Sequence, residues 1–163
     1  MPADATTKIS SILTEMQEIA PAGFAIAFHI QFTTPAFLFQ TYPKEWINIY
    51  NQRGLVMQDP IVGYGFTNNG TVRWAELSDN DPAGVLSAGK EHGLNYGMAL
   101  GLEDGGSRSV AGFARSDREL NDAEIGTLHD MVLEMHRLTA EAKALSPETR
   151  DALREMSVQL THP

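Results

Sequence analysis

Residues 42–62, YPKEWINIYNQRGLVMQDPIV, place three amphipathic aromatic side chains four positions apart. On a helix this spacing puts Tyr42, Trp46 and Tyr50 above one another on a single face. Hydroxyl and indole N–H groups combine an apolar wall with directional donors, which suits a small ligand that has a polar head and an apolar tail. The alternative is that the stripe belongs to the ordinary core, and local spacing leaves both interpretations open.

Asp59 follows this helix and has apolar neighbours on both sides. An unpaired buried carboxylate is very costly, so this side chain is expected to be exposed or matched to a donor. Its position directly before Pro60 also fits a helix N-cap followed by proline at the first helical position. On local sequence alone, the capping role and a ligand-binding role are both open.

Outward from this segment, hydrophobic periodicity predicts the order helix, hairpin, helix, strand, helix, hairpin, with a long final helix. The expected elements are a helix over 9–19, strands 24–32 and 36–41, a helix from 43 closed at 54, a loop with a helical turn over 63–70, an extended segment 71–74, a helix from 82 to 93, strands 95–102 and 108–115, and a helix to 138. Helices lie both before and after the strand pairs. The predicted fold is therefore α/β (α+β), an α-β-α sandwich around a mostly antiparallel sheet of about five strands.

The final helix has a clear start signal. Asn121 with Glu124 three positions later forms a capping-box pattern. His129 and His136 lie seven positions apart on this helix, whereas a helical zinc pair is usually spaced by four. Both histidines are expected at the surface, and no metal is expected.

Composition limits the classes of function that the chain can have. The chain has 163 residues, no cysteine, and 12 basic against 21 acidic residues, for a net charge of −9. These values exclude a disulfide framework or thiolate metal site and disfavour direct DNA binding. Without an apolar run of membrane length or an apolar leader, a cytoplasmic protein with no membrane contact is expected. No nucleophile, carboxylate pair or complete dinucleotide fingerprint stands out, so neither an enzyme nor a cofactor is expected.

One ordered set of residues resembles the autoinducer-binding domain of LuxR-type quorum-sensing transcription factors. The set comprises Tyr42, Trp46, Tyr50, Asp59-Pro60, Trp74, Gly93-Leu94 and Gly97. The similarity spans roughly residues 23–138. It implies an N-acyl homoserine lactone as the small-molecule autoinducer, a homodimer, and ligand binding that is coupled to folding and to transcription control.

The resemblance also implies roles at the ligand head group. Asp59 would accept the ligand's amide N–H, Trp46 would donate to the lactone carbonyl, and Tyr42 would donate to the acyl carbonyl. Trp74 would form an aromatic wall near the lactone ring, and Tyr50 would pack along the start of the acyl chain.

Further residues fall where the family lines its acyl-chain pocket. They are Phe28, Ile30, Ala36, Leu38, Ile61, Val62, Val85, Leu94 and Met98. Register over the first hairpin is left open, and each of them could instead be general core. Ala114 stands where many family members carry a Ser or Thr, which implies that one polar contact is missing or that water replaces it.

The resemblance divides the chain into an autoinducer-binding domain, residues 1–142, and a linker with the truncated start of a helix-turn-helix module, residues 143–163. Leu145-Ser146-Pro147-Glu148 matches the opening of that module, although an ordinary capped helix would explain it equally well. DNA would be bound only through the missing remainder. Two alternatives stay open: a natural fragment that inhibits a full-length regulator by heterodimerisation, and a sensor for a different small molecule.

Overall fold

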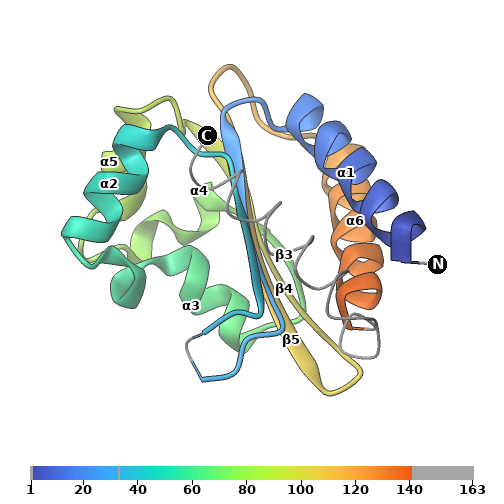
Figure 1. The fold of residues 1–163 in the computed structure, drawn as a ribbon. Helices are drawn as coiled ribbons and strands as arrows, with labels where there is room; N and C mark the ends of the chain where they lie inside the picture. The colour runs from blue at the N-terminus through green and yellow to red at the C-terminus, as the bar shows by residue number, and fades with distance from the viewer. Residues whose placement is uncertain (1, 33, 141–163) are drawn as a thin grey trace.

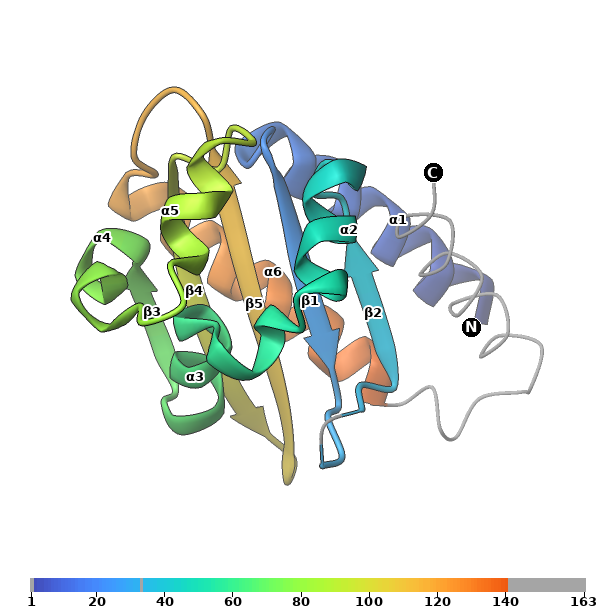
Figure 2. The same ribbon diagram turned by 90° about the vertical axis from the view of Figure 1, so that its left-hand side faces the viewer.

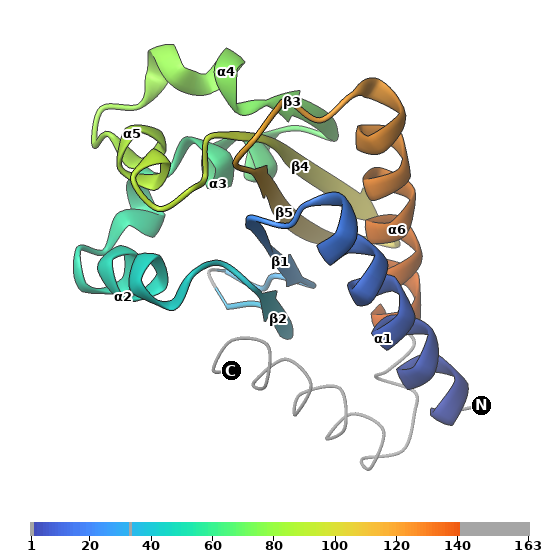
Figure 3. The same cartoon turned by 90° about the horizontal axis from the view of Figure 1, so that it is seen from above.

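The computed structural model describes residues 2–32 and 34–140, which form three layers (Figure 1). A five-stranded antiparallel sheet with the order β2-β1-β5-β4-β3 forms the middle layer. α1 and α6 cover one face, called here the outer face, and α2 to α5 cover the inner face (Figure 3). The predicted sandwich is confirmed. The predicted start of a helix-turn-helix module, residues 143–163, lies outside the described residues.

The elements have the following bounds. The strands are β1 (Gly23–Phe28), β2 (Phe37–Gln40), β3 (Gly70–Arg73), β4 (Tyr96–Asp104) and β5 (Ser107–Arg115). The α-helices are α1 (Pro2–Ile19), α2 (Lys44–Gln52), α3 (Pro60–Thr67), α4 (Trp74–Leu77), α5 (Val85–Lys90) and α6 (Asp122–Ala140). Two 3₁₀ turns, η1 (Leu55–Gln58) and η2 (Ser78–Asn80), connect helices on the inner face.

Large side chains fill the space between the outer face and the helices α1 and α6. Phe24, Ile26 and Phe28 alternate along β1, as the pleat of a strand requires, and all three point to this side. Met16 of α1 and Val132 of α6 meet them, and all five side chains are fully buried. Burial of this layer supplies much of the hydrophobic stabilisation of the fold.

The first strand is shorter than predicted. β1 ends at Phe28 because His29 adopts a positive φ of 53° and so leaves the extended conformation. Gln31 and Thr34 form an isolated bridge across the tip of the connection, where Phe32 also has a positive φ of 60°. The hairpin itself is as predicted, with Ala27 opposite Leu38 and Phe28 opposite Phe37.

Residues 63–67 correct the predicted loop over 63–70, because α3 continues through them to Thr67. Its first turn is stabilised by the Asp59 cap and by Pro60 at the start. A glycine at position 65 lowers helix propensity, yet a Cβ there would collide with the Val110 side chain. The glycine that suggested a loop therefore allows α3 to pack closely on β5.

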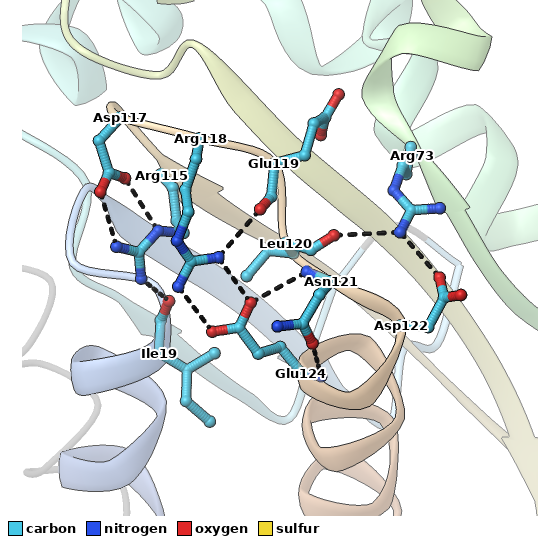
Figure 4. Close-up of polar contacts among 10 residues, drawn as sticks. All are labelled: Ile19, Arg73, Arg115, Asp117, Arg118, Glu119, Leu120, Asn121, Asp122 and Glu124. Atoms are coloured by element: carbon cyan, nitrogen blue, oxygen red, sulfur yellow. Dashed lines mark hydrogen bonds and ion pairs between the residues drawn. The ribbon is translucent and has the colours of Figure 1, made fainter.

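The start of α6 is tied to the rest of the fold by ion pairs and hydrogen bonds (Figure 4). The predicted capping box is confirmed: the Glu124 amide donates to the Asn121 side chain at 2.8 Å, and the Asn121 amide donates to the Glu124 carboxylate at 2.9 Å. Arg118 binds the same carboxylate, and Arg73 bridges β3 to Asp122 at 2.8 Å. Arg115 donates to the Ile19 carbonyl oxygen at the end of α1. These contacts tie the start of α6 to β3 and the end of α1 to β5.

His136 is fully buried, so its predicted surface position is wrong. Its Nε2 lies 2.9 Å from the Asp104 carbonyl oxygen and donates to it, and its Nδ1 forms a hydrogen bond with the Ser109 hydroxyl at 2.8 Å. The ring of His29 lies 4.4 Å from the His136 ring. Hydrogen bonding explains how these polar rings are tolerated in the outer layer.

Candidate ligand-binding site

A cavity of about 510 Å³ separates the inner face of the sheet from α2, η1, α3, α4 and α5. Figure 2 looks toward this side of the molecule, where α2, α3, α4 and α5 lie in front of the strands. The lining is mostly apolar. A volume of this size, with a few polar groups converging on it, is typical of a small-molecule site.

Small residues on the inner face of the sheet create the space. Ala25 and Ala27 alternate with the large outer residues of β1, and Ala25 lies opposite Gly112 of β5. Ala27 lies opposite Val110. Since methyl groups and a bare backbone cover this part of the sheet, the facing helices stand over unfilled volume.

Asp59 forms part of the polar end of the cavity, where both predicted interpretations of its role have support. Its Oδ1 caps α3 by accepting the Ile61 amide at 2.9 Å, and its Oδ2 accepts the Tyr50 hydroxyl at 2.7 Å. The residue is only 9% exposed and also lines the cavity. Burial raises the pKa of Asp59, and the hydrogen bonds from Tyr50 and Ile61 counteract that rise.

Tyr42 and Trp46 bring two further donors to the same end. Both line the cavity, and neither the Tyr42 hydroxyl nor the Trp46 indole N–H has a hydrogen-bond partner among residues 2–32 and 34–140. Burial and the nearby Asp59 carboxylate raise the pKa of Tyr42, so its hydroxyl keeps its proton. Two donors and one carboxylate therefore converge on the cavity.

Aromatic rings fix the geometry of this end. The Trp46 ring meets Tyr50 edge-on with centroids 6.0 Å apart, and it contacts His92 at 5.5 Å. Trp74 closes another wall and packs directly over Gly97, where any Cβ would overlap the indole. The Trp74 indole nitrogen is buried and has no hydrogen-bond partner in the described part of the chain.

Most of the predicted site residues come together here. Those that line the cavity are Tyr42, Trp46, Tyr50, Asp59, Trp74, Ile30, Leu38, Ile61, Val62, Val85 and Leu94. They come from the β1–β2 hairpin, from α2 and the segment before it that contains Tyr42, from α3 and its Asp59 cap, from α4 and α5, and from the segment before β4.

Four predicted pocket residues do not line the cavity. Phe28 and Met98 point to the outer face, because each lies on the opposite side of its strand from the cavity-lining positions. Ala36 is exposed just before β2. Ala114 is buried against the inner-face helices but lies outside the lining.

Sequence reasoning missed the small residues of the sheet and one end of the cavity. Ala25, Ala27 and Gly112 line it, as do Val56, Met57 and Phe66. The alternation of large and small residues along 24–28 indicated that the two alanines share one face of the strand. For the second group the signal was weak, because exposed apolar residues are common.

Other chemistries lack a basis in the described residues. In that part of the chain, no group of three or more His, Cys, Asp or Glu side chains is placed to hold a metal ion. No described helix has the length and apolarity needed to cross a membrane.

Residues 23–144 match the autoinducer binding domain family. The chain belongs to this family. The resemblance to LuxR-type regulators is thereby confirmed, and the autoinducer-binding domain is a ligand-binding unit of transcriptional regulators rather than an enzyme.

Known proteins agree with this assignment. The domain is 28% identical over 100 residues to the transcriptional activator VanR of Vibrio anguillarum, covering 60% of this chain and 42% of VanR. It shares its fold with SdiA in complex with octanoyl-rac-glycerol (TM-score 0.61, 20% identity, 88% of this chain and 63% of that one). CepR2 of Burkholderia cenocepacia, an N-acylhomoserine lactone dependent LuxR family factor, gives a TM-score of 0.56 at 16% identity, covering 83% of this chain and 93% of that one.

Proposed function

We propose that the cavity binds an N-acyl homoserine lactone, with the head group at the end that contains Tyr42, Trp46 and Asp59. The observation that carries this proposal is a pair of donors that have no partner in the described part of the chain and lie beside a buried carboxylate in a mostly apolar cavity. A lactone amide offers two carbonyl oxygens and one N–H, which complement two donors and one acceptor.

Each group then has one task. Trp46 donates to the lactone carbonyl, Tyr42 donates to the acyl carbonyl, and Asp59 accepts the amide N–H. Asp59 keeps lone pairs for this purpose after it accepts from Tyr50 and Ile61. Tyr50 orients the carboxylate, and Trp74 forms the wall beside the lactone ring.

Ligand binding would then act on the fold. A molecule that fills the cavity stabilises the folded domain by RT ln(1 + [L]/Kd). We propose that this stabilisation supports homodimer formation and transcription control in the cytoplasm, with DNA contacted by a separate module. Heterodimerisation with a full-length regulator remains the alternative output.

Isothermal titration with N-octanoyl homoserine lactone tests the head-group roles. Asp59→Asn, Trp46→Phe and Tyr42→Phe should each raise the dissociation constant about tenfold to hundredfold, because each removes or weakens one hydrogen bond. Tyr96→Phe and Asp79→Asn are matched controls, since both residues lie outside the cavity lining. Unchanged affinity in all three site variants would reject the proposal.

An acyl glycerol is the second candidate, because SdiA shares the fold and its complex contains octanoyl-rac-glycerol. This ligand has hydroxyls but no amide N–H, so it would use Asp59 differently. Parallel titration with octanoyl-rac-glycerol separates the two classes at equal chain length. Tighter binding of the glycerol ester would replace the lactone as the proposed ligand.

A further inference from the structure

The cavity is open and apolar at one end. Val56, Met57 and Phe66 line it and are nevertheless 48%, 80% and 40% exposed. Side chains that contact both the cavity and solvent mark an opening between them. Together with Ile30 and Pro35, which also line the cavity, these residues are called here the apolar mouth.

Ile30 and Pro35 of the apolar mouth lie away from the Tyr42 hydroxyl along the direction of β1, whereas Val56 and Met57 precede Asp59 in η1. The Tyr42 hydroxyl lies beside the Ala25–Gly112 pair, since a Cβ at Gly112 would be 3.1 Å from its oxygen. Ala27 lies two residues further along β1, roughly 7 Å away. Ile30 follows in the connection to β2, and Figure 2 shows that connection and α3 toward the same end of the sheet.

The volume sets a length for the acyl chain. If each heavy atom with its hydrogens takes the space of one molecule of liquid water, roughly 30 Å³, the cavity of about 510 Å³ holds about 17 heavy atoms. A homoserine lactone with its amide group accounts for about nine of them. The first acyl carbon is one of these nine atoms, so about eight further carbons, an acyl group of about nine carbons, fill the cavity as far as the apolar mouth that forms part of its lining.

We propose that the ligand belongs to the long-chain class, with an acyl group of about nine or more carbons whose end lies in the apolar mouth. This inference rests on the proposed function and adds the chain length. Met57 and Phe66 contact the terminal carbons and select for length. Because the opening leads to solvent, carbons beyond the enclosed part gain less affinity but meet no wall.

A chain-length series tests the inference. N-hexanoyl, octanoyl, decanoyl, dodecanoyl and tetradecanoyl homoserine lactones are titrated into the intact chain by calorimetry. Affinity should rise about fourfold per added carbon up to about ten carbons, because each buried methylene contributes a constant increment. It should then level off, with the tetradecanoyl ligand within tenfold of the best. An optimum at hexanoyl or octanoyl followed by a steep fall would overturn the inference.

Variants at the opening provide a second readout. Met57→Ser should weaken dodecanoyl binding severalfold more than it weakens hexanoyl binding. Its side chain is largely exposed, so the fold should tolerate the change. Phe32→Ser is the matched control, because this apolar side chain is 97% exposed near the opening but does not line the cavity.

Different results would refute the chain-length inference and the lactone site itself. If short lactones bind best, or if Met57→Ser weakens hexanoyl and dodecanoyl binding equally, chain-length selection at the mouth is refuted while the lactone site stands. If no lactone of any length binds the folded chain, the proposed function is refuted and the chain-length inference with it.

Discussion

The two faces of the sheet are built from the same strands but differ in the size of their side chains. On β1, Phe24, Ile26 and Phe28 face outward and are fully buried against helices, whereas Ala25 and Ala27 face inward and leave a cavity. A period of two residues is enough to separate them. The outer layer stabilises the fold, and the inner layer leaves room for a ligand.

Truncation on each face should give the largest contrast. Phe28→Ala removes a fully buried ring that packs edge-on against Phe39 at 5.9 Å, and it should lower the free energy of unfolding by about 3–5 kcal/mol. Leu38→Ala on the cavity side should cost the unliganded domain less than about 2 kcal/mol, because its side chain already borders unfilled volume. Urea unfolding measures both changes. Equal losses would mean that the faces are packed alike.

Filling the cavity should make the inner face resemble the packed outer face and so exclude the ligand. Ala27→Leu adds volume on the inner face, so it should leave the free energy of unfolding within about 1 kcal/mol and weaken dodecanoyl lactone binding at least about tenfold. Ala123→Leu, at an exposed position of α6, is the matched control and should leave binding unchanged. Undiminished binding to a folded Ala27→Leu variant would place the ligand elsewhere.

Acidity should affect the inner face through Asp59. Burial raises the pKa of Asp59 above the ordinary 3.8, so the unliganded folded domain binds this proton more tightly than the unfolded chain does. The stability that the bound proton contributes is lost as pH rises through the raised pKa. A ligand amide N–H favours the ionised form. Lactone affinity should therefore fall as pH is lowered from 7 through the pKa of Asp59.

Calorimetric titrations at several pH values measure this dependence. Asp59→Asn supplies the reference, because it cannot titrate and should bind weakly with a flat profile. An identical pH profile in the variant and the parent chain would assign the dependence to another group.

The smallest effect should occur at the solvent-exposed edge of the outer layer. Arg118 lowers the pKa of Glu124 to about 2, so this pair contributes stability above pH 4.5 that is lost as pH falls toward 2. Because the Arg118 side chain is about half exposed, Glu124→Gln should cost only about 0.5 kcal/mol at pH 7 and less at pH 3. Urea unfolding at both pH values is the measurement, and a loss that grows at pH 3 would contradict this account.

Local patterns predicted much of this fold. The Trp46–Tyr50 spacing on α2 and the Asn121–Glu124 capping box depend on neighbouring residues, so sequence was enough to find them, although Tyr42 of the predicted stripe lies before α2. Features set by distant contacts were not predicted. A glycine at 65 suggests a loop until β5 is known to pack against it.

The residues of the candidate site show the same difference between local patterns and distant contacts. Tyr42, Trp46 and Asp59 lie within one local segment, and the structure brings them to one end of the cavity. Phe28 and Met98 were assigned to the wrong face, because a choice of one residue in strand register inverts every side chain. The burial of His136 depends on partners in β4 and β5 that no local pattern indicates.

Native mass spectrometry tests the central claim most directly. The chain is expressed in a host that produces N-acyl homoserine lactones, purified without added ligand, and weighed under native and denaturing conditions. The account predicts an added mass under native conditions that equals an N-acyl homoserine lactone and disappears on denaturation, and Asp59→Asn should reduce its occupancy. A folded chain that carries no added mass, or one that retains a compound without a lactone head, would contradict it.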